Sequence, residues 1–310
     1  MTMAMDPLAL DMDRSVDQQL RRFSYTDAAH GKELYSFYGN RVIEHVTASG
    51  TTVAIKVKTP DAMDSTEADM MHHAATNNIL APKVLTFYDI VVNKSIARAM
   101  VSERVPGVPL SDVWNDYDED QQEHVKDQLR AQLARMRQVT QPYIGRVDRQ
   151  PTRNMFDRTQ NSTCGPFATE KEFDRWCLGH VAAKPLARLR WRLALRHMRK
   201  DPSTKTNKNN NNGRKNSKAS ANSDFDRRQR FVLTHGDLTP RNIMVDGTTL
   251  TGIVDWERSG FYPEYAEYAF AMVLCHEHEK WWIPVLKDIL DPCPEQRLTF
   301  TRLVEDNYPY

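Results

Sequence analysis

The chain has 310 residues, which is enough for one large domain or for two lobes with a sizeable core. Its 42 Lys and Arg residues balance 41 Asp and Glu residues, so the overall charge points to no acidic or basic partner. Four scattered cysteines without a C-x-x-C pair argue against a zinc site and a disulfide framework, and they indicate a reducing compartment.

The first 30 residues are polar and rich in methionine, and they predict a flexible N-terminal segment. Residues 1–15 have no basic start followed by a long apolar run, so we expect no signal peptide. The longest apolar run, at residues 268–275, is far shorter than the roughly 20 residues that a membrane helix needs. We therefore expect a cytoplasmic protein without a membrane partner.

Two pairs of strands are predicted in an N-terminal lobe at residues 31–104. Residues 41–46 and 52–57 alternate around a Thr-Ala-Ser-Gly loop, and residues 87–92 and 95–101 flank a second turn. A helix is expected between the two pairs, from about Asp64 to Asn78. Together these elements predict a small antiparallel sheet that carries one helix. No G-x-G-x-x-G pattern, the usual phosphate-binding loop, precedes this helix.

Helices dominate the predicted second lobe, residues 105–310, and the boundary between the two lobes falls within a Pro- and Gly-rich linker at residues 100–109. Val125, Leu129, Leu133 and Met136 recur at helical spacing and predict a long amphipathic helix. The fold class expected from both lobes is α+β.

One stretch of the second lobe is basic and poor in apolar residues. Residues 201–223 are rich in Asn, Lys and Ser and predict a disordered insertion, because they cannot bury enough apolar surface to fold. Residues 181–230 contain fifteen Lys and Arg against three Asp. A solvated helix with a flexible loop explains this charge. We do not expect nucleic-acid binding, since only Trp191 and Phe225 supply aromatic rings, whereas an anionic surface or a calmodulin-like partner stays open.

Most of the candidate catalytic and metal-binding residues lie in residues 231–257, FVLTHGDLTPRNIMVDGTTLTGIVDWE. A β-hairpin is predicted around Asp246-Gly247, since both residues adopt positive φ at low cost. A two-residue turn would place Asp255 opposite Leu238, and a four-residue turn would place it opposite Pro240. In either register Asp255 lies beside the loop that holds Asp237 and Asn242. Two carboxylates and an amide oxygen suit Mg²⁺.

This spacing resembles that of a known family. The run His235-Gly-Asp237-Leu-Thr-Pro-Arg-Asn242, with Asp255 thirteen residues later, is similar to the catalytic and metal-binding loops of kinase-like phosphotransferases. Protein kinases carry HRD and DFG at these two positions. HGD and IVDWE in their place are typical of the aminoglycoside phosphotransferase and choline kinase family. GFYPEYAEYA, at residues 260–269, resembles fungal members of it.

The resemblance implies a two-lobed protein-kinase-like fold that transfers the γ-phosphoryl group of ATP to a hydroxyl of a small molecule. Asp237 would accept or orient the hydroxyl proton, and Asn242 and Asp255 would hold Mg²⁺. Lys56, in the run Val53-Ala-Ile-Lys, would neutralise the nucleotide phosphates.

Three further residues receive expected roles from the same resemblance. Glu103 belongs to the linker whose backbone would bind the adenine edge, and His235 would brace the catalytic loop. Glu67 stands where the family places the partner of Lys56. Asp64-Ser-Thr-Glu67 is also a capping box, in which Glu67 would instead fold back onto Asp64.

The sequence says less about the phosphate acceptor. Glu257, Glu264 and Glu267 could line an acidic pocket for a cationic substrate, or they could face solvent at a helix start. An acid that the family carries after its Gly-x-Pro segment is missing, which puts antibiotic phosphorylation in doubt. A non-catalytic, pseudokinase-like binding module is the alternative function. The oligomeric state stays open.

Overall fold

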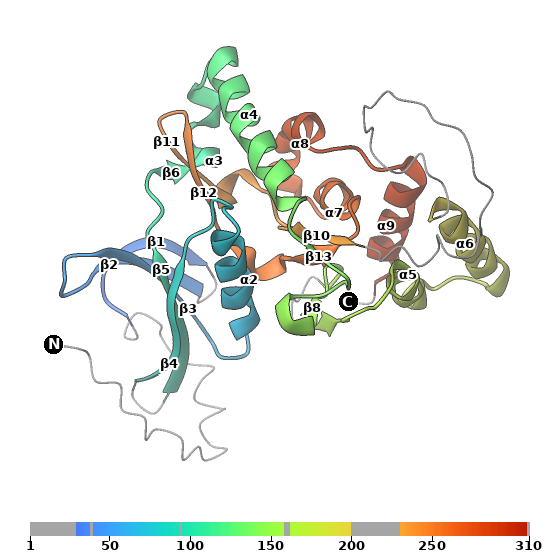
Figure 1. Ribbon diagram of the computed structural model, residues 1–310, viewed down its shortest axis with the longest axis horizontal. Coiled ribbons are helices and arrows are strands. Elements are labelled where there is room, and N and C mark those ends of the chain that lie inside the picture. The colour runs from blue at the N-terminus through green and yellow to red at the C-terminus, as the bar shows by residue number, and fades with distance from the viewer. Residues whose placement is uncertain (1–28, 38–39, 93–94, 158–161, 200–229, 309–310) are drawn as a thin grey trace, which may run out of the picture. The chain divides into compact units, whose positions relative to one another are not determined.

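In a computed structural model of the protein, residues 29–37, 40–92, 95–157, 162–199 and 230–308 are described (Figure 1). The predicted insertion at 201–223 and nearly all of the predicted N-terminal segment lie outside these residues. The chain divides into two compact units, Met1–Gln132 with Thr239–Glu257, and Leu133–Leu238 with Arg258–Tyr310. The predicted lobe boundary at residues 104 and 105 stays a prediction.

The first unit contains most of the strands. Its elements are β1 (Lys32–Phe37), β2 (Asn40–Val46), β3 (Thr52–Lys58), α2 (Ser65–Thr76), β4 (Val84–Val92), β5 (Ser95–Glu103), β6 (Val108–Pro109), α3 (Leu110–Val113), η2 (Trp114–Asp116), η6 (Pro240–Asn242), β11 (Ile243–Asp246) and β12 (Thr249–Ile253). Helix α4 (Glu119–Met136) begins in this unit and ends in the second.

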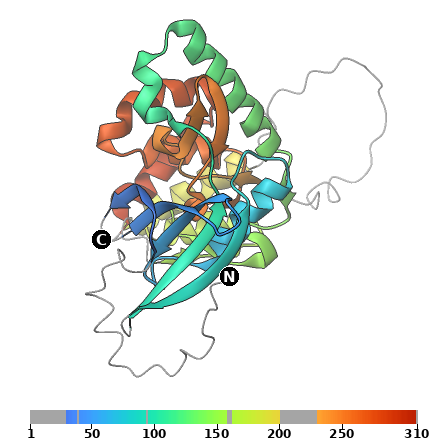
Figure 2. The same ribbon diagram turned by 90° about the vertical axis from the view of Figure 1, so that its left-hand side faces the viewer.

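A five-stranded antiparallel sheet in the order β1-β2-β3-β5-β4 organises the first unit. Both hairpins predicted from the sequence are present, β2 with β3 and β4 with β5, and β1 adds an edge strand. Figure 2 shows the long β4–β5 hairpin in teal. Helix α2 contacts β4 and lies alongside the sheet (Figure 1).

Strand β3 separates an apolar face from a charged one. Val53, Ile55 and Val57 are buried in a core with residues of β2 and β5, because side chains two apart on a strand share a face. Lys56 and Lys58 alternate with these residues, and they therefore extend from the opposite face of β3. This alternation places two lysines side by side at the centre of the sheet.

Strands β11 and β12 form the predicted hairpin, but its two-residue turn is one residue further along than the Asp246-Gly247 turn that was one of the two predicted alternatives. Asp246 pairs with Thr249, so Gly247 and Thr248 occupy the turn. Gly247 has φ +55°, and a glycine at the first central position is what a type II′ turn requires. Gln128 of α4 fixes this register, since its side chain binds the Thr248 carbonyl and the Leu250 N–H at 2.8 and 2.9 Å.

The second unit is mainly helical. Its elements are β7 (Thr140–Gln141), η3 (Val147–Arg149), β8 (Thr152–Arg153), β9 (Thr163–Cys164), α5 (Glu170–Gly179), α6 (Pro185–Met198), β10 (Phe231–Thr234), β13 (Gly260–Tyr262), α7 (Ala266–Val273), η8 (Glu277–Trp282), α8 (Ile283–Ile289) and α9 (Glu295–Asn307). The 3-10 helix η7 (Trp256–Arg258) begins in the first unit and ends in the second.

A short sheet and a buried ion network hold the second unit together. Strand β10 pairs with β13 on one side and β7 on the other. Arg297 of α9 is buried, binds Asp174 of α5 at 2.6 Å and also pairs with Glu170. Its guanidinium lies 4.5 Å from the Tyr265 ring. With a strand-rich first unit and a helix-rich second unit, the expected α+β class is confirmed.

Candidate functional site

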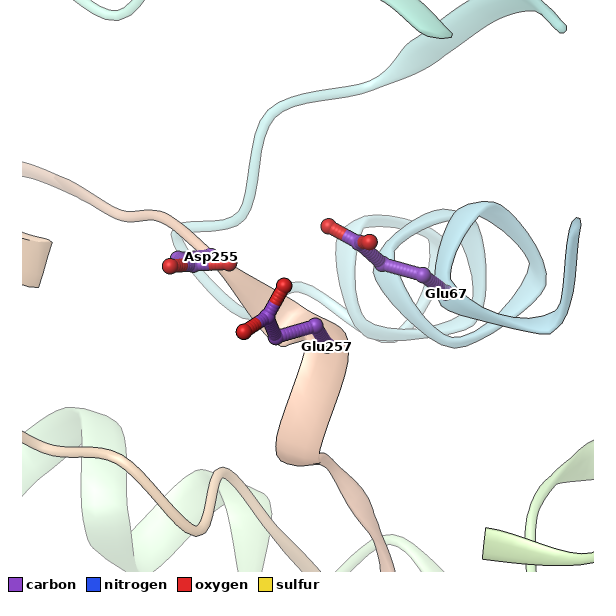
Figure 3. A group of neighbouring side chains, drawn as sticks. All are labelled: Glu67, Asp255 and Glu257. Atoms are coloured by element: carbon purple, nitrogen blue, oxygen red, sulfur yellow. The ribbon is translucent and has the colours of Figure 1, made fainter. Parts of the chain in front are cut away.

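Lys56 of β3 is the centre of a charged cluster in the first unit. Its Nζ lies 2.7 Å from Glu67 Oε1 and 2.8 Å from Asp255 Oδ1. Glu257 Oε2 lies 3.5 Å from the same nitrogen and 2.5 Å from Lys58 Nζ. The three carboxylates come within 4.8 Å of one another, and Figure 3 shows them turned toward a common point.

The backbone of α2 presents Glu67 to this cluster. Asp64 caps the helix by accepting the Thr66 N–H at 2.8 Å. The Glu67 carboxylate is buried and pairs with Lys56, so its side chain does not fold back onto Asp64 as a capping box would require. Of the two arrangements that the sequence left open, the structure has the ion pair.

The hairpin brings Asn242 and Asp255 together. Ile243 pairs with Ile253, and the Asn242 carbonyl accepts the Val254 N–H at 2.8 Å. Continuing this register places Asp255 across from Arg241. The register predicted for a two-residue turn at Asp246-Gly247 is therefore wrong. The register predicted for a four-residue turn has the observed pairing of Val245 with Leu250, but a bulge between the Met244 and Val245 pairings moves Asp255 from Pro240 to Arg241.

Asp255 has an unusual backbone conformation. Its φ is +64°, in the left-handed region that non-glycine residues rarely adopt. Such conformations cluster at functional sites, where the surrounding structure imposes them. Aspartate tolerates this region better than most residues, because its short side chain can bond locally.

Charge within the cluster is nearly compensated. Three carboxylates face two ammonium groups, which leaves one formal negative charge. Burial lowers the pKa of Lys56, but Asp255, Glu67 and Glu257 more than offset this and hold it well above the ordinary value. Burial and Asp255 raise the pKa of Glu257, whereas Lys56 and Lys58 lower it, and the net direction is downward.

Lys58 is the member of the cluster that the sequence did not single out. It is 7% exposed and binds Glu257 directly. The available signal was its spacing, since a residue two positions from Lys56 on a strand lies on the same face. Lys58 keeps Glu257 paired inside the cluster.

Replacing Lys58 with methionine is expected to lower the free energy of unfolding by about 3 kcal/mol, because it removes the nearest partner of the Glu257 carboxylate, whose side chain is only 13% exposed. Lys83→Met is the matched control. Lys83 lies 3.7 Å from Glu103, with side chains 65% and 50% exposed, and the loss of such a surface pair costs about 0.5 kcal/mol or less. Denaturant titration measures both values. Equal losses in the two variants would show that the Lys58–Glu257 pair stabilises the fold no more than the exposed Lys83–Glu103 pair does.

Acid titration should show the lowered pKa of Glu257. A carboxylate whose pKa is depressed on folding stabilises the protein above its unfolded value and loses that contribution as the pH falls through the folded one. The stability difference between wild type and Glu257→Gln should therefore be constant near neutral pH and shrink below about pH 4.5, the ordinary value. Thermal melts from pH 7 to pH 3 measure the difference, and a gap that widens on acidification contradicts the ion-pair assignment.

The His235-Gly236-Asp237 segment follows β10 in the second unit. Glu267 accepts the backbone N–H groups of His235 and Gly236 at 2.7 and 2.8 Å. His235 is fully buried, and its Nδ1 accepts the Asp237 N–H at 3.3 Å. Gly236 has φ +80°, and a Cβ there would meet the Arg258 carbonyl oxygen at 2.9 Å. The loop is thus fixed on both sides of its glycine.

Two of the three acids considered for substrate binding have other partners. Glu267 is 3% exposed and both of its carboxylate oxygens accept hydrogen bonds from the loop, which fits neither the acidic pocket nor the solvent-facing position that the sequence left open. Burial raises its pKa, against the opposing effects of His235 and the two N–H groups. Glu257 contacts Lys56 and Lys58, whereas Glu264 is exposed and its carbonyl accepts from Arg137 at 2.9 Å.

Glu103 ends β5, at the start of the predicted linker. Its N–H donates to the Lys83 carbonyl at 2.9 Å, and its carbonyl accepts the Ser102 hydroxyl at 3.3 Å. Its side chain is half exposed beside Lys83. Any backbone contact with a base would therefore have to use the carbonyl.

A strand lysine paired with a helix glutamate in the sheet-containing first unit, together with a mainly helical second unit in the same chain, defines a kinase-like α+β fold. The profile of the phosphotransferase enzyme family matches residues 32–291, and the chain belongs to this family. Among curated proteins, no sequence matches the chain.

Solved structures share the fold at low identity. The crystal structure of aminoglycoside phosphotransferase APH(4)-Ia is 14% identical, with a TM-score of 0.52, over 94% of this chain and 90% of that one. A Thermobifida fusca protein assigned as a fructosamine-3-kinase is 15% identical, with a TM-score of 0.54, over 96% and 91%. Such identities show the fold alone.

Proposed function

We propose that this protein transfers the γ-phosphoryl group of ATP to a hydroxyl of a small molecule, with Mg²⁺ as the metal. Family membership supports a phosphotransferase, and a structural neighbour with a TM-score of 0.50 was solved with ADP and hygromycin B. The observation that carries the proposal is the position of Lys56, 2.7 Å from Glu67 and 2.8 Å from Asp255.

The donor set fits Mg²⁺. All three clustered acids offer carboxylate oxygens, which magnesium prefers, and Glu67 Oε2 is buried without a hydrogen-bond partner among the described residues. Asp255 would hold the ion together with Asn242, whose backbone bonds to the residue before Asp255. When bound, Mg²⁺ neutralises charge on the β- and γ-phosphates.

Lys56 would serve the nucleotide through the same atom that now contacts Asp255. Its ammonium donates to phosphate oxygens when these are present, while Glu67 keeps the side chain extended from β3. The downward-shifted pKa of Glu257 and the upward-shifted pKa of Lys56 keep both groups charged at neutral pH. The lysine is thus preorganised in the cationic form that phosphate binding needs.

Asp237 would orient the acceptor hydroxyl and receive its proton. Bracing by Glu267 and His235, with Gly236 in a conformation that favours glycine, limits the movement of the Asp237 backbone. Of the acids considered for a cationic acceptor, Glu264 is the exposed one and stays the candidate.

An acceptor screen tests the proposal. Purified protein with Mg-ATP is offered amino alcohols, sugars, fructosamines and aminoglycosides that include hygromycin B, and ADP release above the water background is measured. At least one acceptor should raise the rate.

A melt with and without Mg-ATP separates a missing acceptor from a non-catalytic fold. A ligand at 100 times its Kd adds about 2.7 kcal/mol to stability. A shift without turnover would mean that the acceptor was not in the panel. No shift at millimolar Mg-ATP would instead support the non-catalytic binding module.

A further inference from the structure

Helix α6 in the second unit has one face packed on the protein and one face bare. Leu195 and Met198 are buried, and the Trp191 ring lies 5.4 Å from that of Phe300 in α9. On the opposite face Leu186, Leu189 and Leu193 are 62%, 50% and 57% exposed. At about 100° per residue these leucines fall within an arc of about 60°, so they form one stripe.

Exposed cations border this stripe on both sides. By the same helical geometry Arg190 lies next to Leu186, and Arg196 lies next to Leu189, with Arg192 beyond it. All three arginines are exposed, and the sequence of α6, PLARLRWRLALRHM, contains no acid. The bare face therefore combines apolar and positively charged groups.

The charge of this face selects its partner. In place of the expectation of no membrane partner, we propose that the outer face of α6 docks on an anionic phospholipid surface. Leucines between arginines match the boundary between acyl chains and anionic headgroups, where a helix lies in the plane of the membrane. No helix in the described part of the chain is long and apolar enough to cross a bilayer, so the contact is peripheral.

The packing of α6 against its own unit favours a partner with a flat surface over a partner that encloses the helix. A groove of the calmodulin type surrounds its target, but α6 keeps Trp191, Leu195 and Met198 against its own unit. A membrane needs only the outer face. Residues 200–229, which follow α6 in the sequence, hold eight Lys and Arg against three Asp, so their net charge has the same sign as that of the arginines.

Vesicle co-sedimentation of the full chain tests the proposal. Wild type should bind vesicles of phosphatidylcholine with 30% phosphatidylserine, and should bind neutral phosphatidylcholine vesicles at least about tenfold more weakly. Arg190→Gln with Arg196→Gln should weaken binding to the anionic vesicles about 30-fold, at about 1 kcal/mol per arginine. Leu189→Glu with Leu193→Glu should abolish it.

Controls separate this surface from general stickiness. Leu85→Glu replaces a leucine on β4 that is 52% exposed and should leave binding unchanged. The melting temperature of each variant should match that of wild type, since the replaced side chains are exposed.

Several results would overturn the proposal. These are no binding to anionic vesicles, equal binding to neutral ones, or loss on deletion of residues 203–222 but not in the leucine variant. If wild type sediments as a dimer and the leucine variant sediments as a monomer, the stripe contacts a second copy of the chain instead.

Discussion

Replacing Asp237 with asparagine is expected to lower kcat for the best acceptor by about 10²–10⁴-fold, the range typical of general-base assistance. Asparagine keeps the size of the side chain and removes its basicity. The loop should survive, because it is held through backbone N–H groups that bind Glu267 and His235. The Kd for Mg-ATP, measured by calorimetry, should stay within about twofold of wild type.

Glu264→Gln is the matched control for Asp237→Asn, since it removes an exposed carboxylate from the same unit. It should change KM for a cationic acceptor and leave kcat for a neutral one intact. Turnover near wild type in Asp237→Asn would remove Asp237 from the chemistry. A fall in both kcat and melting temperature would mean that the variant reports on folding instead.

Replacing Asp255 with asparagine is expected to weaken Mg-ATP binding about 100-fold, or ~2.7 kcal/mol, because the charged one of the two proposed metal ligands is lost. Asparagine tolerates the left-handed backbone at this position, so the hairpin should keep its conformation. Binding of ATP without metal should not weaken, since the cluster loses one of its three negative charges.

Titration calorimetry with and without Mg²⁺ separates these two effects. Glu257→Gln removes a neighbouring carboxylate that lies 3.5 Å from the same lysine, and it controls for charge alone. Equal losses with and without Mg²⁺ in Asp255→Asn would assign Asp255 to the structure of the cluster. A loss confined to Mg-ATP supports the metal role.

The sequence predicted local structure well where one residue type dictates it. Alternating Val and Ile gave the β2–β3 hairpin, and Asp64 gave the start of α2 at Ser65. It also named Lys56, Glu67 and Asp255, which the fold brings together although 199 positions separate Lys56 from Asp255. The family resemblance, rather than the residues alone, supplied that pairing.

Tertiary contacts decided what the sequence could not. The hairpin turn moved by one residue because Gln128, more than a hundred positions earlier, holds Thr248 and Leu250. The charge of Glu267 left a substrate pocket and a solvent-facing position open, yet its side chain is buried and binds two backbone N–H groups. The sequence did not single out Lys58, because a strand lysine gives the same sequence pattern whether its side chain faces water or a carboxylate of the protein.

The left-handed backbone of residue 255 also limits how this position can change. Glycine, asparagine and aspartate fit that conformation, and only aspartate brings a charge. Codons for glycine and for asparagine each differ from an aspartate codon by a single nucleotide. If Asp255 has the proposed metal role, a stable fold that no longer binds Mg²⁺ therefore lies one mutation away, whereas a β-branched residue would disturb the hairpin itself. The proposed activity would then be lost at this codon without loss of the folded protein.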